Sequence, residues 1–143
     1  MELKMPSPEQ AYWGLRAMKT VALADGELSA LEVHMLEAIQ RVHGTAYLLE
    51  QLEPITPVDL ARALPDPQLR RQLVQGLIVM SLIDREASQQ ETDLIEQYAQ
   101  ALEVSIPEVK DLRYLLKGEI LKLRLDLARR FWLREKVVGI WND

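Results

Sequence analysis

An acidic stretch that occurs twice constrains the fold of this chain more than any other feature. The first copy reads Asp-Gly-Glu-Leu-Ser-Ala-Leu-Glu over residues 25–32, and the second reads Asp-Arg-Glu-Ala-Ser-Gln-Gln-Glu over residues 84–91. The copies are 59 residues apart, and the apolar residues on either side of them also align. A repeat of this kind indicates that the chain is built from similar structural units. We therefore expect two pseudo-symmetric helix–acidic turn–helix units, related by an approximate two-fold axis.

Each copy contains the signature of a helix N-terminus. Ser29 and Glu32, and likewise Ser88 and Glu91, have the spacing of a capping box, in which the serine and glutamate side chains bond each other's backbone amides. Apolar residues follow both boxes at intervals of three and four, as in a helix with one buried face. The helix before the first copy is expected to end near Gly26, because glycine permits the left-handed conformation that closes many helices.

The rest of the chain also has helical periodicity. Ser, Thr or Asp followed closely by proline marks helix starts near residues 8, 57, 67 and 106. A short helix is expected over residues 46–52, and the helix over residues 67–83 is expected to be the most buried. Gly118 is expected to separate the preceding helix from a basic amphipathic helix over residues 119–143. Since no segment alternates with period two, we expect an all-α bundle of about seven or eight helices.

Composition excludes several classes of protein. A length of 143 residues is sufficient for one domain with its own core, and 48% hydrophobic and 27% charged residues are ordinary for a soluble protein. The absence of cysteine excludes disulfides, thiolate catalysis and cysteine-type zinc sites. No apolar run approaches the ~20 residues of a membrane span, and residues 1–7 have no signal-peptide core. We therefore expect a cytoplasmic protein.

Charge is unevenly distributed along the chain. Residues 1–109 carry 8 Lys and Arg against 17 Asp and Glu, whereas residues 110–143 carry 9 against 5. The acidic body is expected to repel nucleic acid. Two interpretations of the basic C-terminal helix stay open. It packs on the body with ion pairs such as Glu119–Lys122, or it binds a protein partner, a second copy in a homodimer, or the surface of a membrane.

The acidic turns likewise have a structural and a functional interpretation. Asp25 and Asp84 are expected near helix C-termini, where the helix dipole disfavours a carboxylate. The capping boxes explain the presence of Glu32 and Glu91, but they do not explain these two aspartates. Hydrogen bonds within each turn are the structural explanation. The functional explanation is a divalent-cation site, since converging carboxylates bind Mg²⁺ or Ca²⁺ in preference to Zn²⁺. The turns offer Asp25, Glu27, Asp84 and Glu86 directly as candidate metal ligands.

The repeated motif resembles the TerB (tellurite-resistance B-like) family. The likeness rests on residues 24–32, on the second copy and on Leu-Glu-Val-Ser at residues 102–105, and it covers about residues 10–115. It implies a compact helical domain with an acidic, metal-binding cluster at one end, in a non-enzymatic component of stress-response systems. By motif, the resemblance implies six candidate metal ligands, which are Asp25, Glu27 and Glu32 in the first copy and Asp84, Glu86 and Glu91 in the second. Arg85 stands where the family has glycine, so the first copy is expected to dominate any site.

No catalytic pattern is found in the sequence. His34 and His43 lack the spacing of a zinc-protease motif, no serine has the context of a nucleophile elbow, and no glycine-rich phosphate loop is present. We therefore expect a non-enzymatic protein. It is either a TerB-like stress-response or scaffold module that binds a divalent cation, or a metal-free interaction domain whose acidic end or basic helix docks a partner.

Overall fold

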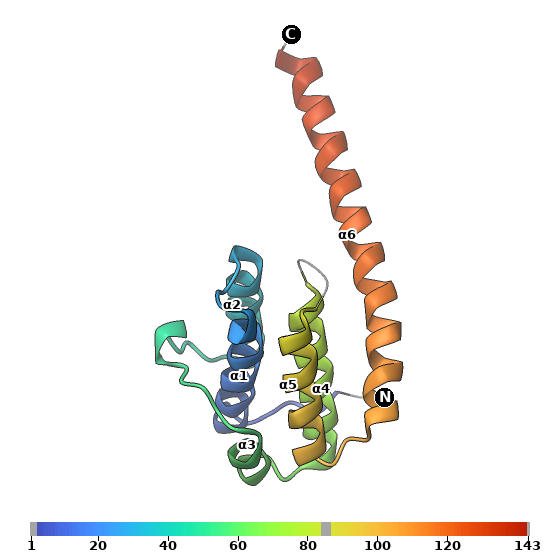
Figure 1. Cartoon of the computed structure of the whole chain (residues 1–143). Coiled ribbons are helices and arrows are strands. Elements are labelled where there is room, and N and C mark those ends of the chain that lie inside the picture. The colour runs from blue at the N-terminus through green and yellow to red at the C-terminus, as the bar shows by residue number, and fades with distance from the viewer. Residues whose placement is uncertain (1–2, 84–86, 143) are drawn as a thin grey trace.

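The protein is all-helical over the residues that the structure describes (Figure 1). The computed structural model describes residues 3–83 and 87–142, and for residue 124 and residues 127–142 it describes the backbone alone. Two short 3₁₀ turns, η1 (Leu23–Asp25) and η2 (Leu49–Gln51), connect longer elements. The α-helices are α1 (Pro8–Ala22), α2 (Ala30–His43), α3 (Pro57–Ala63), α4 (Pro67–Leu82), α5 (Gln89–Ala101) and α6 (Ile106–Asn142).

Side-chain caps begin most of these helices, as the sequence predicts. Ser7, Ser29 and Ser88 form capping boxes in which both reciprocal hydrogen bonds are present. Thr56 and Asp66 accept a hydrogen bond from the backbone amide three residues further on, and a proline follows each of them. Each cap stabilises its helix by about 1 kcal/mol, because it satisfies a backbone donor that the helix leaves without a partner.

The helix predicted over residues 46–52 is not formed. Only the turn η2 lies there, and side chains from other helices bind its backbone instead. The Gln40 amide accepts from the Tyr47 backbone N–H at 2.6 Å and donates to the Tyr47 carbonyl at 2.9 Å. The Lys19 ammonium donates to the Leu49 carbonyl. Since these tertiary hydrogen bonds satisfy the backbone groups, the segment gains little from forming a helix.

Gly118 does not end a helix, contrary to the prediction. The helix α6 runs without interruption from Ile106 to Asn142, so residues 119–143 do not begin a separate helix. A single glycine in a helix interior costs only about 1 kcal/mol relative to alanine, and good helix formers surround this one. Six α-helices therefore form in the described residues, fewer than the predicted number. None of these helices combines the length and the apolar character that crossing a bilayer requires.

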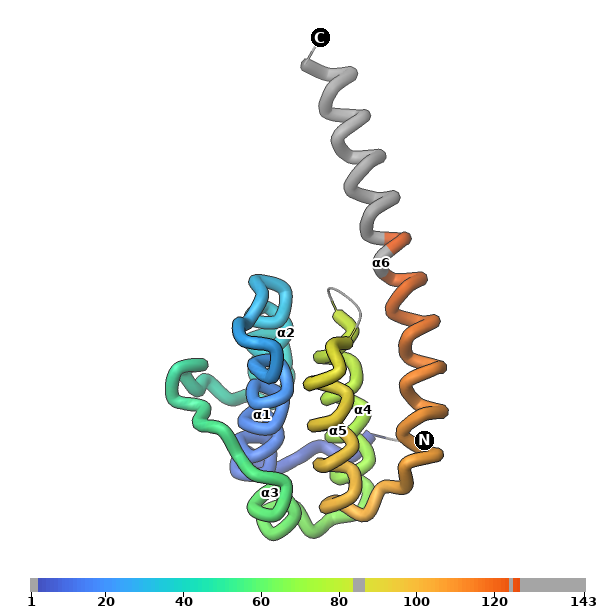
Figure 2. Tube along the Cα trace, in the orientation of Figure 1, coloured from blue at the N-terminus to red at the C-terminus, as the bar shows by residue number. Residues whose placement is uncertain are grey.

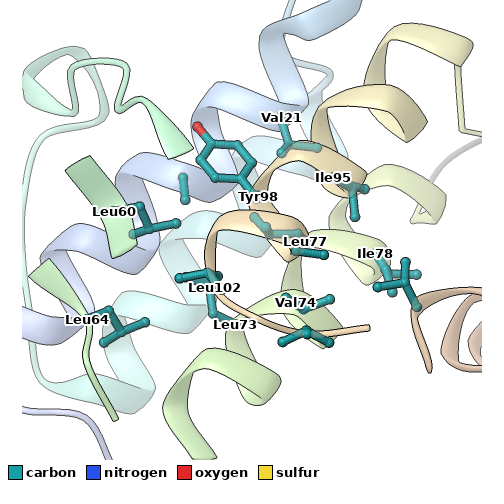
Figure 3. Close-up of a cluster of buried hydrophobic side chains, with 14 of the residues drawn as sticks. Val21, Leu60, Leu64, Leu73, Val74, Leu77, Ile78, Ile95, Tyr98 and Leu102 are labelled. Carbon is teal, nitrogen blue, oxygen red and sulfur yellow. The ribbon is translucent and has the colours of Figure 1, made fainter. Parts of the chain in front are cut away.

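The main core lies between α1, α4 and α5, and α3 and α6 close its edges (Figure 3). Helix α4 packs against α1, α5 and α6 and has more buried side chains than any other described helix, which confirms its predicted central place. Tyr98 is fully buried in this core, and its hydroxyl donates a hydrogen bond to the Ile55 carbonyl. A second cluster, centred on Leu15 and Leu36, joins α1 to α2.

Candidate acidic site

The C-terminal ends of α1 and α4 lie at the same end of the bundle, next to the predicted acidic stretches (Figures 1 and 2). Helix α1 ends at Ala22 and continues as η1 to Asp25, and α2 then begins at Ala30. At the same end, α4 finishes at Leu82 and α5 begins at Gln89. The turn η1 also packs against α5, so the first acidic stretch contacts the helix that carries the second capping box.

Gly26 shapes the first turn. Its φ angle is 123°, which L-amino acids with a side chain rarely adopt, and its N–H donates to the Leu23 carbonyl at 2.9 Å. The corresponding residue of the second copy is Arg85. Arg85, Asp84 and Glu86 lie outside the described residues. The prediction that Arg85 makes the first copy dominate the site therefore concerns residues that the structure does not describe.

Among the described carboxylates at this end, Glu32 and Glu91 are the buried ones, each only 1% exposed. In the first box, the Ser29 N–H donates to Glu32 Oε1 at 2.8 Å and the Glu32 N–H donates to Ser29 Oγ at 3.1 Å. In the second box, the Ser88 N–H donates to Glu91 Oε1 at 3.0 Å and the Glu91 N–H donates to Ser88 Oγ at 3.1 Å. Burial of a carboxylate is unfavourable unless hydrogen bonds replace its hydration, and the capping boxes supply such bonds.

The carboxyl of Glu91 lies within electrostatic reach of the first turn. Burial is the main factor that raises the pKa of Glu91, and the hydrogen bonds from Ser88 act in the opposite direction. The negative charges of Asp25 and Glu32 raise the pKa of Glu91 further. Carboxylates from both copies of the repeat therefore repel one another, as like charges at short range do.

The four candidate ligands that the structure describes have different surroundings. Asp25, Glu32 and Glu91 are brought together, whereas Glu27 is exposed at the edge of the turn. Over residues 3–83 and 87–142, no group of three His, Asp or Glu side chains is arranged to hold a metal ion. The described carboxylates thus form an electrostatic cluster without forming a metal-ligand set by themselves.

Helix α6 carries an apolar surface that was not predicted from the sequence. Tyr114, Leu121 and Leu125 are 86%, 54% and 62% exposed, although Ile120 of the same helix is buried in the core. Tyr114, Leu121 and Leu125 are spaced by seven and four residues, so they share one face of the helix. The spacing of these apolar residues can be read from the sequence and would have indicated an apolar helix face.

No family model, no curated protein and no solved structure matches this chain. The acidic site and the apolar face of α6 are therefore interpreted from their own chemistry.

Proposed function

We propose that this protein is a non-enzymatic, TerB-like interaction module whose acidic end binds a divalent cation. The observation that carries this proposal is the burial of Glu32 and Glu91 in matched capping boxes, with the charge of Asp25 close to Glu91. Clustered carboxylates destabilise a fold unless a proton or a cation neutralises them. Oxygen ligands at a turn favour Mg²⁺ or Ca²⁺. Asp84 and Glu86 belong to the proposed ligand set on the strength of the repeat.

We also propose that the chain is a single domain in which α1–η1–α2 and the α4–α5 pair are pseudo-symmetric units. The matching capping boxes at residues 29 and 88 and the direct packing of α1 on α4 support this arrangement. A cytoplasmic stress-response role is part of the same proposal. It rests on the resemblance of residues 24–32 and 84–91 to the TerB motif.

Thermal unfolding with and without cations tests the metal proposal. We expect Mg²⁺ or Ca²⁺ to raise the melting temperature of the full chain above its value in chelator. A ligand at 100 times its Kd stabilises the native state by about 2.7 kcal/mol. The double variant Asp25→Asn, Glu27→Gln should lose most of this shift. The matched control Glu53→Gln, Asp59→Asn removes two exposed carboxylates away from the acidic end. Cations should raise the melting temperature of this control as much as that of the wild type. If no ion shifts the melting temperature of the wild type, the metal proposal is wrong.

The exposed apolar face of α6 favours a second candidate function, docking of a protein partner without metal. Val109 and Ile120 bury one side of this helix against the body. Tyr114, Leu121 and Leu125 remain on an exposed side. Large apolar side chains exposed on one face of a helix are typical of a contact surface. The simplest such partner is a second copy of the chain.

Sedimentation velocity over a range of concentrations tests self-association through α6. We expect the wild type to form a dimer and Leu121→Glu, Leu125→Glu to remain a monomer, since charges placed in an apolar interface are strongly unfavourable. The control Leu48→Glu, Val58→Glu changes two other exposed apolar positions and should still dimerise. A wild type that stays monomeric at every concentration would exclude the homodimer.

A further inference from the structure

A cavity of about 400 Å³ lies between α1, α2 and α4. Its walls come from the N-terminal half of α1, the C-terminal end of α2 and one side of α4. Pockets that bind small molecules usually measure about 300–1,000 Å³. This cavity is therefore large enough for a ligand, and it has no residue in common with the proposed acidic site.

The lining of the cavity is largely apolar. Leu15, Met18, Ile39, Leu73 and Val79 are representative of its walls. None of the described residues that line it is Asp, Glu, Lys or Arg, and its polar side chains are three glutamines and one histidine. An ion would lose its hydration here without gaining a counter-ion, which is strongly unfavourable. The lining thus selects a neutral, largely apolar ligand.

Gln75 is the polar group that is best placed to orient such a ligand. The Gln10 amide already accepts a hydrogen bond from the Ser7 N–H, and the Gln72 amide already binds the backbone of Lys4. Gln75 is half-buried at the cavity wall, and its side-chain amide has no hydrogen bond to any residue in the ranges 3–83 and 87–142. Its amide can donate and accept hydrogen bonds, and burial beside a ligand favours their formation.

Residues 3–6 form a strap along one edge of the cavity, where Leu3 and Pro6 contribute to the lining. Gln72 Oε1 accepts from the Lys4 N–H at 2.7 Å, and Gln72 Nε2 donates to the Lys4 carbonyl at 2.9 Å. At the α2 side, Met5 Sδ lies 3.3 Å from His43 Nδ1. The Lys4 ammonium also forms an ion pair with Asp66, the N-cap residue of α4. Because all of these contacts are exposed, the strap can separate from the helices without unfolding the core.

We propose that this cavity binds a neutral, largely apolar small molecule with one hydrogen-bonding group, which contacts Gln75 and is covered in part by the strap of residues 3–6. The proposal is independent of the acidic site, because the two share no residue. It assigns the protein a ligand in addition to any cation or protein partner.

Titration of the full chain with N-phenyl-1-naphthylamine, a neutral apolar fluorophore with one N–H group, tests the proposal. We expect saturable binding of one molecule per chain. Gly14→Leu should weaken it by about tenfold or more, because the new side chain occupies the cavity. A Cβ at Gly14 would lie 3.5 Å from Leu73 Cδ1, an ordinary contact, so the variant is expected to fold. The control Gly118→Leu makes the same change in open space and should bind as the wild type does.

Two further measurements locate the bound probe. In methyl NMR spectra of the wild type, the probe should shift the resonances of Leu73 and Val79, which line the cavity, and leave those of Leu121 unchanged. Gln75→Leu should weaken binding, and Leu121→Glu, Leu125→Glu should not. Absence of saturable binding, unchanged affinity in a folded Gly14→Leu variant, or methyl shifts confined to α6 would each overturn the proposal.

Discussion

Among single residues, Glu91 links the stability of the fold to pH. Its carboxyl has a pKa raised above the usual value of 4.5, chiefly by burial, so the native state holds this proton more tightly than the unfolded chain does. The contribution of Glu91 to stability therefore falls as pH rises from the usual carboxyl pKa through the raised one. Above that window the carboxylate is charged, buried and close to the charges of Asp25 and Glu32.

Glu91→Gln tests this linkage, since glutamine preserves the capping box and removes the titrating group. We expect the free energy of unfolding of the wild type to decrease relative to that of the variant as pH rises through this window. Urea denaturation at a series of pH values measures the difference. Glu53→Gln, which removes an exposed carboxyl, controls for the change in net charge. If the difference in free energy of unfolding between the wild type and Glu91→Gln does not vary with pH, the link between Glu91 and stability is wrong.

A buried hydroxyl contributes to stability at the centre of the core. Tyr98 donates to the Ile55 carbonyl, which lies between η2 and α3. Tyr98→Phe leaves this carbonyl without its donor, so we expect a loss of about 1–3 kcal/mol in the free energy of unfolding. Tyr114→Phe is the matched control, because Tyr114 is almost fully exposed, and it should change stability by less than about 0.5 kcal/mol. Equal effects of the two substitutions would refute this role of Tyr98.

Among elements, one arginine joins the ends of three helices. Arg70 on α4 donates from Nε to the Leu64 carbonyl at 2.6 Å and from Nη2 to the Ala61 carbonyl at 2.9 Å. Its Nη1 lies 3.4 Å from the Leu102 carbonyl. These carbonyls lie at the C-terminal ends of α3 and α5, where the helix dipole favours a positive charge. Arg70 thus holds α3 and α5 in place against α4.

Two adjacent arginines provide a test of this role. We expect Arg70→Met to lower the free energy of unfolding by about 2–4 kcal/mol, because buried carbonyls lose charged donors. Arg71→Met should have an effect below about 0.5 kcal/mol, since Arg71 is exposed and its ion pair with Glu108, at 3.6 Å, is a surface contact. Chemical denaturation of both variants measures the contrast. The role of Arg70 would be contradicted by a loss no greater than that of Arg71→Met.

At the scale of the whole molecule, the described side chains of α6 that belong to the core lie in the first part of the helix. Val109 and Ile120 are buried and Leu116 packs against the core, whereas Leu121, Leu123 and Leu125 are exposed. The observed Glu119–Lys122 ion pair, at 3.6 Å, is also a surface contact. Among the described side chains, packing of α6 on the body therefore ends at Ile120.

Truncation should separate these two parts of α6. We expect deletion of residues 122–143 to leave a chain that unfolds cooperatively, with little loss of stability. Deletion of residues 116–143 should lower the free energy of unfolding by about 2–5 kcal/mol, because it removes Leu116 and Ile120 from the core. Circular dichroism during urea denaturation measures both effects. Unfolding of the chain that lacks only residues 122–143 would show that the end of α6 is part of the fold.

The sequence by itself determined the all-helical class, the capping boxes at Ser29 and Ser88, and the burial of α4. These features depend on hydrogen bonds within three residues and on apolar spacing along one helix, which are local properties. Only the tertiary structure decided that residues 46–52 form no helix, since Gln40 and Lys19 bind their backbone from other helices. The repeat predicted six acidic candidates. Only the packing of η1 on α5 decided that Glu91 is buried near Asp25, because burial and charge depend on segments far apart in the chain.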